Sequence, residues 1–176
     1  LYMAEGLIGA LDRGYDLRVV APEEVADAIN PDVAVTLLTE VDYRTGRMHD
    51  MAALTARAHD AGALTIWDLA HSAGAVPVDL AGVDADFAVG CTYKFLNGGP
   101  GAPAFIYVAP RHADHARPAL SGWLGHAAPF DFEQVYRAGE GLARMRVGTP
   151  PVLAMAALDS ALDIWDGVDM KALRTR

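Results

Sequence analysis

The chain has 176 residues, of which 52% are hydrophobic and 21% are charged, and its formal net charge at pH 7 is −9. These values predict one compact domain, and they argue against a disordered chain and against a nucleic-acid partner, which a basic patch would attract. No apolar stretch reaches the roughly 18 residues needed to span a bilayer, so we expect no membrane partner. The single cysteine cannot form an internal disulfide, which suits the reducing cytoplasm where we expect the protein.

Apolar runs alternate with amphipathic runs along the chain, and this rhythm predicts an α/β fold with a mostly parallel sheet and helices on both of its faces. The β-branched and aliphatic run at 33–38 is typical of a strand buried on both faces. Asp50 is expected to cap the helix that starts at Met51, and Gly62 to end it. Residues 121–151 predict an irregular, glycine-rich stretch. In chain order, the predicted elements are strand 17–20, helix 22–29, strand 33–38, helix 51–60, strands 64–68, 86–91 and 104–108, and helix 152–165.

Both ends of the sequence have a helix-like pattern. The chain begins at Leu1 without an initiator methionine, and it stops at Arg176 in residues that would continue a helix. We therefore expect a piece of a longer polypeptide.

Two charged residues stand at the carboxyl ends of predicted buried strands. Lys94 follows the strand that ends at Cys91, and Asp68 ends the strand that begins at Leu64. Because ligands bind open parallel sheets at the carboxyl ends of their strands, we expect both side chains at one binding edge. A lysine amine can form a Schiff base with the aldehyde of pyridoxal phosphate, and a carboxylate can keep the pyridine nitrogen protonated. The pair therefore predicts a pyridoxal phosphate site.

The neighbours of these two residues strengthen a prediction that each residue alone would not carry. Tyr93 supplies a hydroxyl beside the amine, and the glycine-rich turn 98–101 lets the backbone approach a ligand closely. By itself, Lys94 could be a solvated strand end, Asp68 could cap the following segment, and His71 could be an ordinary polar loop residue. Their combination at two strand ends favours the cofactor site.

Other chemistry finds less support in the sequence. One His-x-x-His spacing, at His112 and His115, has no accompanying array of carboxylates or cysteines, so we predict no metal site. Cys91 lies in a predicted buried strand, where packing is the ordinary role of a cysteine. No phosphate-binding loop, dinucleotide fingerprint or serine-nucleophile elbow is present.

Several blocks of the sequence resemble the kynureninases, which are class V aminotransferase-like enzymes of pyridoxal phosphate fold type I. Tyr93-Lys94, where most class V relatives carry His-Lys or Gln-Lys, and the Gly-Trp-x-Gly-His block at 122–126 make the resemblance specific to kynureninase. In the order of that family, the similar blocks are 41–50, 68–74, 91–101, 121–126 and 146–151.

The resemblance implies a role for each matching residue near the cofactor ring. It implies that Lys94 forms the Schiff base and then moves protons, that Asp68 pairs with the pyridine nitrogen, and that His71 contacts the cofactor nearby. Tyr93 would donate its hydroxyl to the cofactor phosphate, and it is a candidate acid for protonating the substrate β-carbon.

The resemblance also assigns Trp123 and Thr149 to the phosphate region, reached across the interface of a homodimer. Without the family, Trp123 would be interpreted as an interface or core aromatic residue, and Thr149 as a turn residue before two prolines. The family further implies that residues 1–150 are the central part of the large cofactor-binding domain. Residues 151–176 would then form a helix that leads towards a small C-terminal domain.

The implied activity is hydrolysis of L-kynurenine, or of 3-hydroxykynurenine, to anthranilate or 3-hydroxyanthranilate and L-alanine, in tryptophan catabolism or in NAD biosynthesis. The residues do not distinguish the two substrates, and they do not identify the base for water addition. Two alternatives stay open: another class V pyridoxal phosphate enzyme, such as a cysteine desulfurase or a transaminase, and a non-catalytic α/β fragment. We expect this piece of the enzyme to be inactive on its own.

Overall fold

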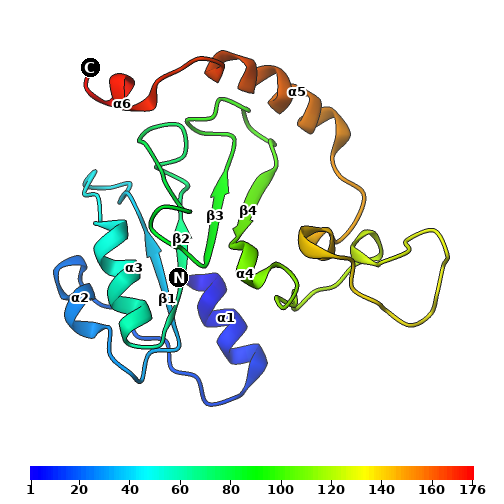
Figure 1. Cartoon of the computed structure of the whole chain (residues 1–176), viewed down its shortest axis with the longest axis horizontal. Helices are drawn as coiled ribbons and strands as arrows, with labels where there is room; N and C mark the ends of the chain where they lie inside the picture. The colour runs from blue at the N-terminus through cyan, green and yellow to red at the C-terminus, as the bar shows by residue number, and fades with distance from the viewer.

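A four-stranded sheet forms the centre of the computed structural model, which describes residues 1–176 (Figure 1). The strands lie side by side in chain order, and three of them are parallel while the last is antiparallel to its neighbour. Their bounds are β1 (Val35–Thr39), β2 (Leu64–Asp68), β3 (Phe87–Cys91) and β4 (Ala104–Val108). The predicted α/β fold with a mostly parallel sheet is confirmed.

One face of the sheet forms the core with two helices, α2 (Val25–Ala28) and α3 (Met51–Asp60). Trp67 of β2 is fully buried here, and its indole nitrogen donates a hydrogen bond of 3.0 Å to the hydroxyl of Thr55 in α3. The α3 helix starts as predicted, because the Asp50 carboxylate accepts a hydrogen bond of 2.9 Å from the amide of Ala53.

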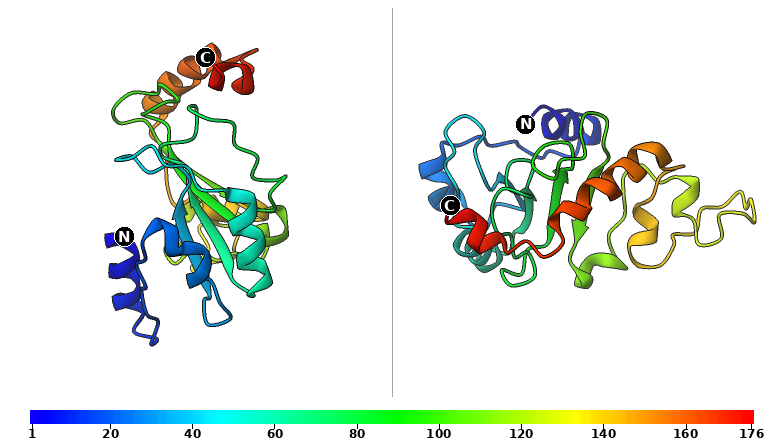
Figure 2. Two further views of the ribbon diagram at one scale, coloured as in Figure 1. Left: turned by 90° about the vertical axis from the view of Figure 1, so that its left-hand side faces the viewer. Right: turned by 90° about the horizontal axis from the view of Figure 1, so that it is seen from above.

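The other face of the sheet is more open. Helix α1 (Tyr2–Leu11) lies on that side, opposite α3, but it buries none of its residues (Figure 2). The prediction that β1 is buried on both faces is wrong for this chain, since Val35 and Leu37 are 47% and 48% exposed. The alternation of buried and exposed side chains along β1 places every second residue against the core and leaves the others on the open face.

The remaining elements agree with the predicted pattern at most positions. The predicted strand 17–20 is wrong, because these residues pair with no strand and Val19 is 67% exposed. No helix is both long and apolar enough to cross a bilayer. The other helices are η1 (Pro22–Glu24), α4 (Pro110–Ala113), η2 (Trp123–Gly125), η3 (Gly141–Met145), α5 (Val152–Leu162), η4 (Asp163–Trp165) and α6 (Met170–Arg174).

A buried ionic network closes the end of the sheet at which β3 begins. Asp86, which is 1% exposed, accepts hydrogen bonds from the backbone and the hydroxyl of Thr65 and lies 2.9 Å from His59 of α3. Arg111 and His112 of α4 each approach the same carboxylate to 2.7 Å. Burial alone would raise the pKa of Asp86, but the hydrogen bonds from His112, His59 and Thr65 outweigh it and hold the pKa far below its usual range. The network joins both helices to the sheet.

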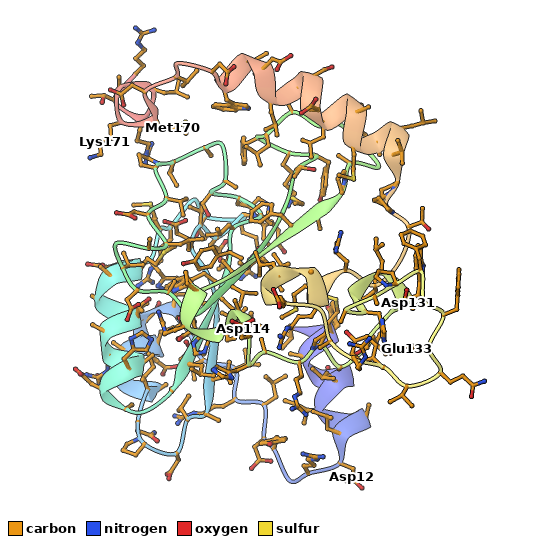
Figure 3. All side chains as sticks on the ribbon, turned by 45° about the vertical axis from the view of Figure 1, so that its right-hand side comes forward. Asp12, Asp114, Asp131, Glu133, Met170 and Lys171 are labelled. Atoms are coloured by element: carbon orange, nitrogen blue, oxygen red, sulfur yellow. The ribbon has the colours of Figure 1, made fainter.

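The segment between β4 and α5 is irregular, as predicted, and part of it stands apart from the sheet. Asp131 and Glu133 mark this outlying loop in Figure 3, and Glu133 pairs with Arg137 at 2.8 Å. Asp114, at the end of α4, accepts a 2.9 Å hydrogen bond from the amide of Gly141 and so attaches η3 to the body of the protein.

Candidate active site

Lys94 and His71 meet at the edge of the sheet where β2 and β3 end. Lys94 lies in the turn after β3, and its Nζ is 2.8 Å from Nε2 of His71, which belongs to the turn after β2. At this distance one nitrogen donates a hydrogen bond and the other accepts it. The half-buried amine therefore has a proton partner within reach.

Asp68 is the last residue of β2 and lies on the more open face of the sheet, level with Thr39 of β1 and Val89 of β3. Its Oδ1 accepts a hydrogen bond of 2.8 Å from the amide of Ala70, so the capping role proposed for it is correct for one oxygen. Its Oδ2 makes no hydrogen bond within the chain. One carboxylate oxygen thus shapes the turn that carries His71, while the other stays available to a ligand.

Gly74 permits the close approach of the turns that carry His71 and Lys94. Its φ of +84° lies in the left-handed region, and a Cβ at this position would come within 2.8 Å of the carbonyl carbon and oxygen of Phe95. Only glycine fits this conformation at this distance. The residue closes the predicted block 68–74, but the sequence alone did not indicate its contact with the lysine turn.

The glycine-rich loop after Lys94 closes under α5, which runs across the end of the sheet at which β3 finishes (Figure 1). The amide of Gly98 donates to the carbonyl of Thr92 at 2.9 Å, and Gly99 and Gly101 both have a positive φ. A Cβ on Gly98 would lie 3.1 Å from Leu158 of α5. The sequence predicted that the backbone of this loop passes close to another group, and at Gly98 that group is α5 of the protein itself.

Tyr43 is a neighbour of the site to which no role was assigned from the sequence. Its ring stacks on the ring of His71, with 5.7 Å between centroids and 30° between planes. The loop that carries it folds back through a bridge between Val41 and Met48. In the sequence, the only indication that this loop belongs to the site was its place in the block 41–50, which resembles the family.

Tyr93 lies beside the lysine, as predicted, with its ring centroid 5.4 Å from the Lys94 amine. The side chain is 47% exposed, and its hydroxyl makes no hydrogen bond within the chain. The predicted contact of this hydroxyl with a phosphate therefore stays a prediction.

Trp123 and Thr149 belong to two segments that pack against each other. Gly122 packs against the backbone of Val147, and Trp123 Nε1 lies 3.9 Å from where a Cβ on Gly148 would stand. Both predicted phosphate ligands are exposed, and the aromatic contact of Trp123 is with Phe130. Within one chain, the structure brings together Lys94, Tyr93 and His71, with Asp68 at the end of the strand that leads to His71.

Comparisons with known proteins agree with the resemblance. The chain is 56% identical over 176 residues to a kynureninase of Deinococcus radiodurans, covering 100% of this chain and 43% of that protein. It is 53% identical to a kynureninase of Pseudomonas fluorescens, covering 100% of this chain and 42% of the relative. The chain thus spans less than half the length of these relatives.

Solved structures share the fold at lower identity. An apo cysteine desulfurase of Thermococcus onnurineus superposes with a TM-score of 0.74 at 22% identity, over 94% of this chain and 42% of that one. A cysteine desulfurase of Escherichia coli gives a TM-score of 0.69 at 24% identity, over 84% and 36%. The family model described as Aminotransferase class-V matches residues 14–176. Since the family model covers residues 14–176 and the relatives match the whole chain at more than half identity, the chain belongs to the class-V aminotransferase family.

Proposed function

We propose that the chain is part of a pyridoxal phosphate-dependent kynureninase. The observation that carries the proposal is the contact of 2.8 Å between Lys94 and His71, at the sheet edge that also holds Asp68. The 56% identity to a kynureninase across the whole chain supports this choice of enzyme within the family. Residues 1–150 would belong to the large domain, and 151–176 would lead to a small one.

The residues of the site fit pyridoxal phosphate. Lys94 offers an amine for the aldehyde, and Asp68 has an oxygen, Oδ2, without a partner in the chain for the protonated pyridine nitrogen. Tyr93 has a free hydroxyl that would donate to the phosphate. When bound, the cofactor supplies the electron-withdrawing ring that makes the α-proton of an amino acid acidic.

In the proposed mechanism, Lys94 and His71 handle the proton. With pyridoxal phosphate bound, the Lys94 amine would be placed to accept the proton from the substrate α-carbon. The contact of 2.8 Å allows His71 Nε2 to take a proton from Nζ or return one, which keeps the amine available as a base. The Asp68 carboxylate would hold the positive charge of the pyridine nitrogen in place.

The proposed substrate is L-kynurenine or 3-hydroxykynurenine, and the bond cleaved joins the β-carbon to the aryl ketone carbon. Water supplies the hydroxyl that turns this ketone carbon into the carboxyl group of the aromatic acid. The β-carbon gains a proton and leaves as part of alanine. Tyr93 is the candidate donor of that proton, because its ring stands beside Lys94.

The proposed enzyme is a cytoplasmic homodimer. Trp123 and Thr149 are both exposed, which leaves them free to contact the site of a second protomer. Trp123→Ala should therefore weaken pyridoxal phosphate binding by the dimer. A mixed dimer of one Trp123→Ala protomer and one Lys94→Ala protomer should contain one intact site and so bind more cofactor than either variant alone. Cofactor content that does not change on mixing would argue against the shared site.

A cysteine desulfurase is the competing function, because solved desulfurases share the fold. A desulfurase needs a reactive cysteine, and the one cysteine of this chain lies in β3 with Sγ 3.7 Å from the carbonyl oxygen of Ala70. The complete protein, loaded with pyridoxal phosphate, should release fluorescent anthranilate from L-kynurenine and no sulfide from L-cysteine. The reverse result would favour the desulfurase.

A further inference from the structure

Tyr43 is a surface tyrosine whose aromatic partner belongs to the candidate site. Its side chain is 74% exposed, so it adds little to the hydrophobic core. Its ring stacks on the ring of His71, with 5.7 Å between the centroids and 30° between the planes. The guanidinium of Arg44 lies 5.7 Å from the same ring, but this side chain is itself 70% exposed. The contact with His71 therefore explains the place of the ring better than burial does.

The loop that carries Tyr43 is a tight turn, which holds the ring in one place. The Asp42 carboxylate accepts hydrogen bonds from the amide of Arg44 at 2.7 Å and from the amide of Thr45 at 3.1 Å. The carbonyl of Asp42 accepts a further bond of 2.8 Å from the amide of Gly46. These bonds converge on the residue directly before Tyr43, so its backbone is fixed although its side chain is exposed.

The base of this loop is attached to the strand that leads to His71. The amide of Glu40 donates to the carbonyl of Asp68 at 3.1 Å, and the carbonyl of Glu40 accepts from the amide of His49 at 2.9 Å. Asp68 is the last residue of β2, and the turn of His71 follows it. The loop of Tyr43 and the turn of His71 therefore start from the same point of the sheet, and the stacked rings join them a second time.

The direction in which His71 presents its Nε2 depends on the rotation of the imidazole ring. Rotation about the last side-chain bond of a histidine is broad, so a contact with the ring has to select one orientation. In the orientation observed, Nε2 lies 2.8 Å from Nζ of Lys94. Stacking on Tyr43 favours this ring plane, because turning the imidazole out of it would break the contact between the two faces.

We propose that Tyr43 is a positioning residue, whose ring stacks on His71 and keeps Nε2 directed at Lys94. The inference rests on the proposed function of Lys94 as the cofactor-binding amine. Tyr43 acts through His71, and stacking uses its ring and not its hydroxyl. A stack of this kind changes an equilibrium between two ring orientations by about three- to tenfold.

The first test follows the ring of His71 in the complete apoprotein, isotopically labelled at the histidine Cε1 carbons, by NMR. The resonance of His71, identified by its absence in His71→Gln, should carry the ring-current shift of Tyr43. In Tyr43→Leu it should move towards the position of a free histidine, and in Tyr43→Phe it should stay, because the ring is kept. A resonance that is the same in Tyr43→Leu and in the wild type would overturn the proposal.

The second test compares the affinity of the same variants for pyridoxal phosphate, by titration of the apoprotein. Tyr43→Leu should bind the cofactor about three- to tenfold more weakly, and Tyr43→Phe should stay within about twofold of the wild type. Tyr43→Leu combined with His71→Gln should lose no more than His71→Gln alone, because Tyr43 acts through His71. Losses that add in the double variant, or a Tyr43→Phe as weak as Tyr43→Leu, would contradict the proposal.

Tyr15→Leu is the matched control, because it makes the same substitution at a tyrosine that is 51% exposed and lies outside the site. It should change neither the resonance of His71 nor the affinity for the cofactor, and a loss equal to that of Tyr43→Leu would overturn the proposal. A wild type that binds the cofactor but does not cleave kynurenine would count against the proposed function alone, since the resonance and the affinity still test the stack.

Discussion

Gly74→Ala should destabilise the protein at the contact between the two turns of the site. An alanine at φ +84° costs about 1–2 kcal/mol, because its Cβ crowds its own backbone. The same Cβ would stand 2.8 Å from the carbonyl group of Phe95, and relieving this clash by moving backbone costs a further 1–3 kcal/mol or so. The expected loss of unfolding free energy is therefore about 2–5 kcal/mol.

Gly62→Ala is the control that separates the two costs. Gly62 has nearly the same φ, +81°, but a Cβ there would meet no atom within 4 Å. Urea denaturation of the complete protein should give a loss of about 1–2 kcal/mol for this variant. Only Gly74→Ala should also weaken pyridoxal phosphate binding, because moving its turn away from Phe95 separates His71 from Lys94. Equal losses in the two variants, with equal cofactor affinity, would refute this account of the site.

Two further predictions concern the core. Asp86→Asn should cost about 1–3 kcal/mol at neutral pH, because it replaces a buried carboxylate that accepts several hydrogen bonds. Since the folded pKa of Asp86 is lowered, its contribution is present above the unfolded pKa of about 3.9 and is lost as the pH falls towards the folded value. Urea unfolding at pH 7, 5, 4 and 3 should therefore show that the difference between wild type and variant shrinks only below about pH 4, and a difference that does not shrink there would contradict this. Thr55→Val removes the acceptor of the buried Trp67 indole and should cost about 1–3 kcal/mol in the same assay, whereas a loss no greater than that of an exposed substitution would mean that the bond is not needed.

Much of the sheet could be predicted because its signals are local. The bounds of the strands at 64–68 and 104–108 were predicted to the residue, because a short apolar run bounded by turn residues is typical of a buried strand. The run at 17–20 has the same composition and forms no strand, because a strand also needs a partner, which depends on residues far away in the sequence. Burial of β1 on both faces failed because no element packs closely on the open face of the sheet, where α1 buries none of its residues.

The positions of the site residues were predictable where a reactive side chain lies at the carboxyl end of a strand. Lys94 and His71 lie in contact and Asp68 ends the neighbouring strand, because the ends of neighbouring parallel strands share an edge of the sheet, while their roles towards a cofactor stay predictions. Tyr43 was not identified, since its contact with His71 depends on a loop that folds back onto the turn after β2.

The release of anthranilate from L-kynurenine by the complete protein, with and without Lys94, tests the central claim most directly. The wild type reconstituted with pyridoxal phosphate should produce fluorescent anthranilate and an equal amount of alanine, and it should show the visible absorbance of protein-bound cofactor. Lys94→Ala should lose both the absorbance and the product, because no other amine stands at the end of β3. Turnover that survives in Lys94→Ala, or a wild type that binds the cofactor and leaves both kynurenine and 3-hydroxykynurenine intact, would contradict the account.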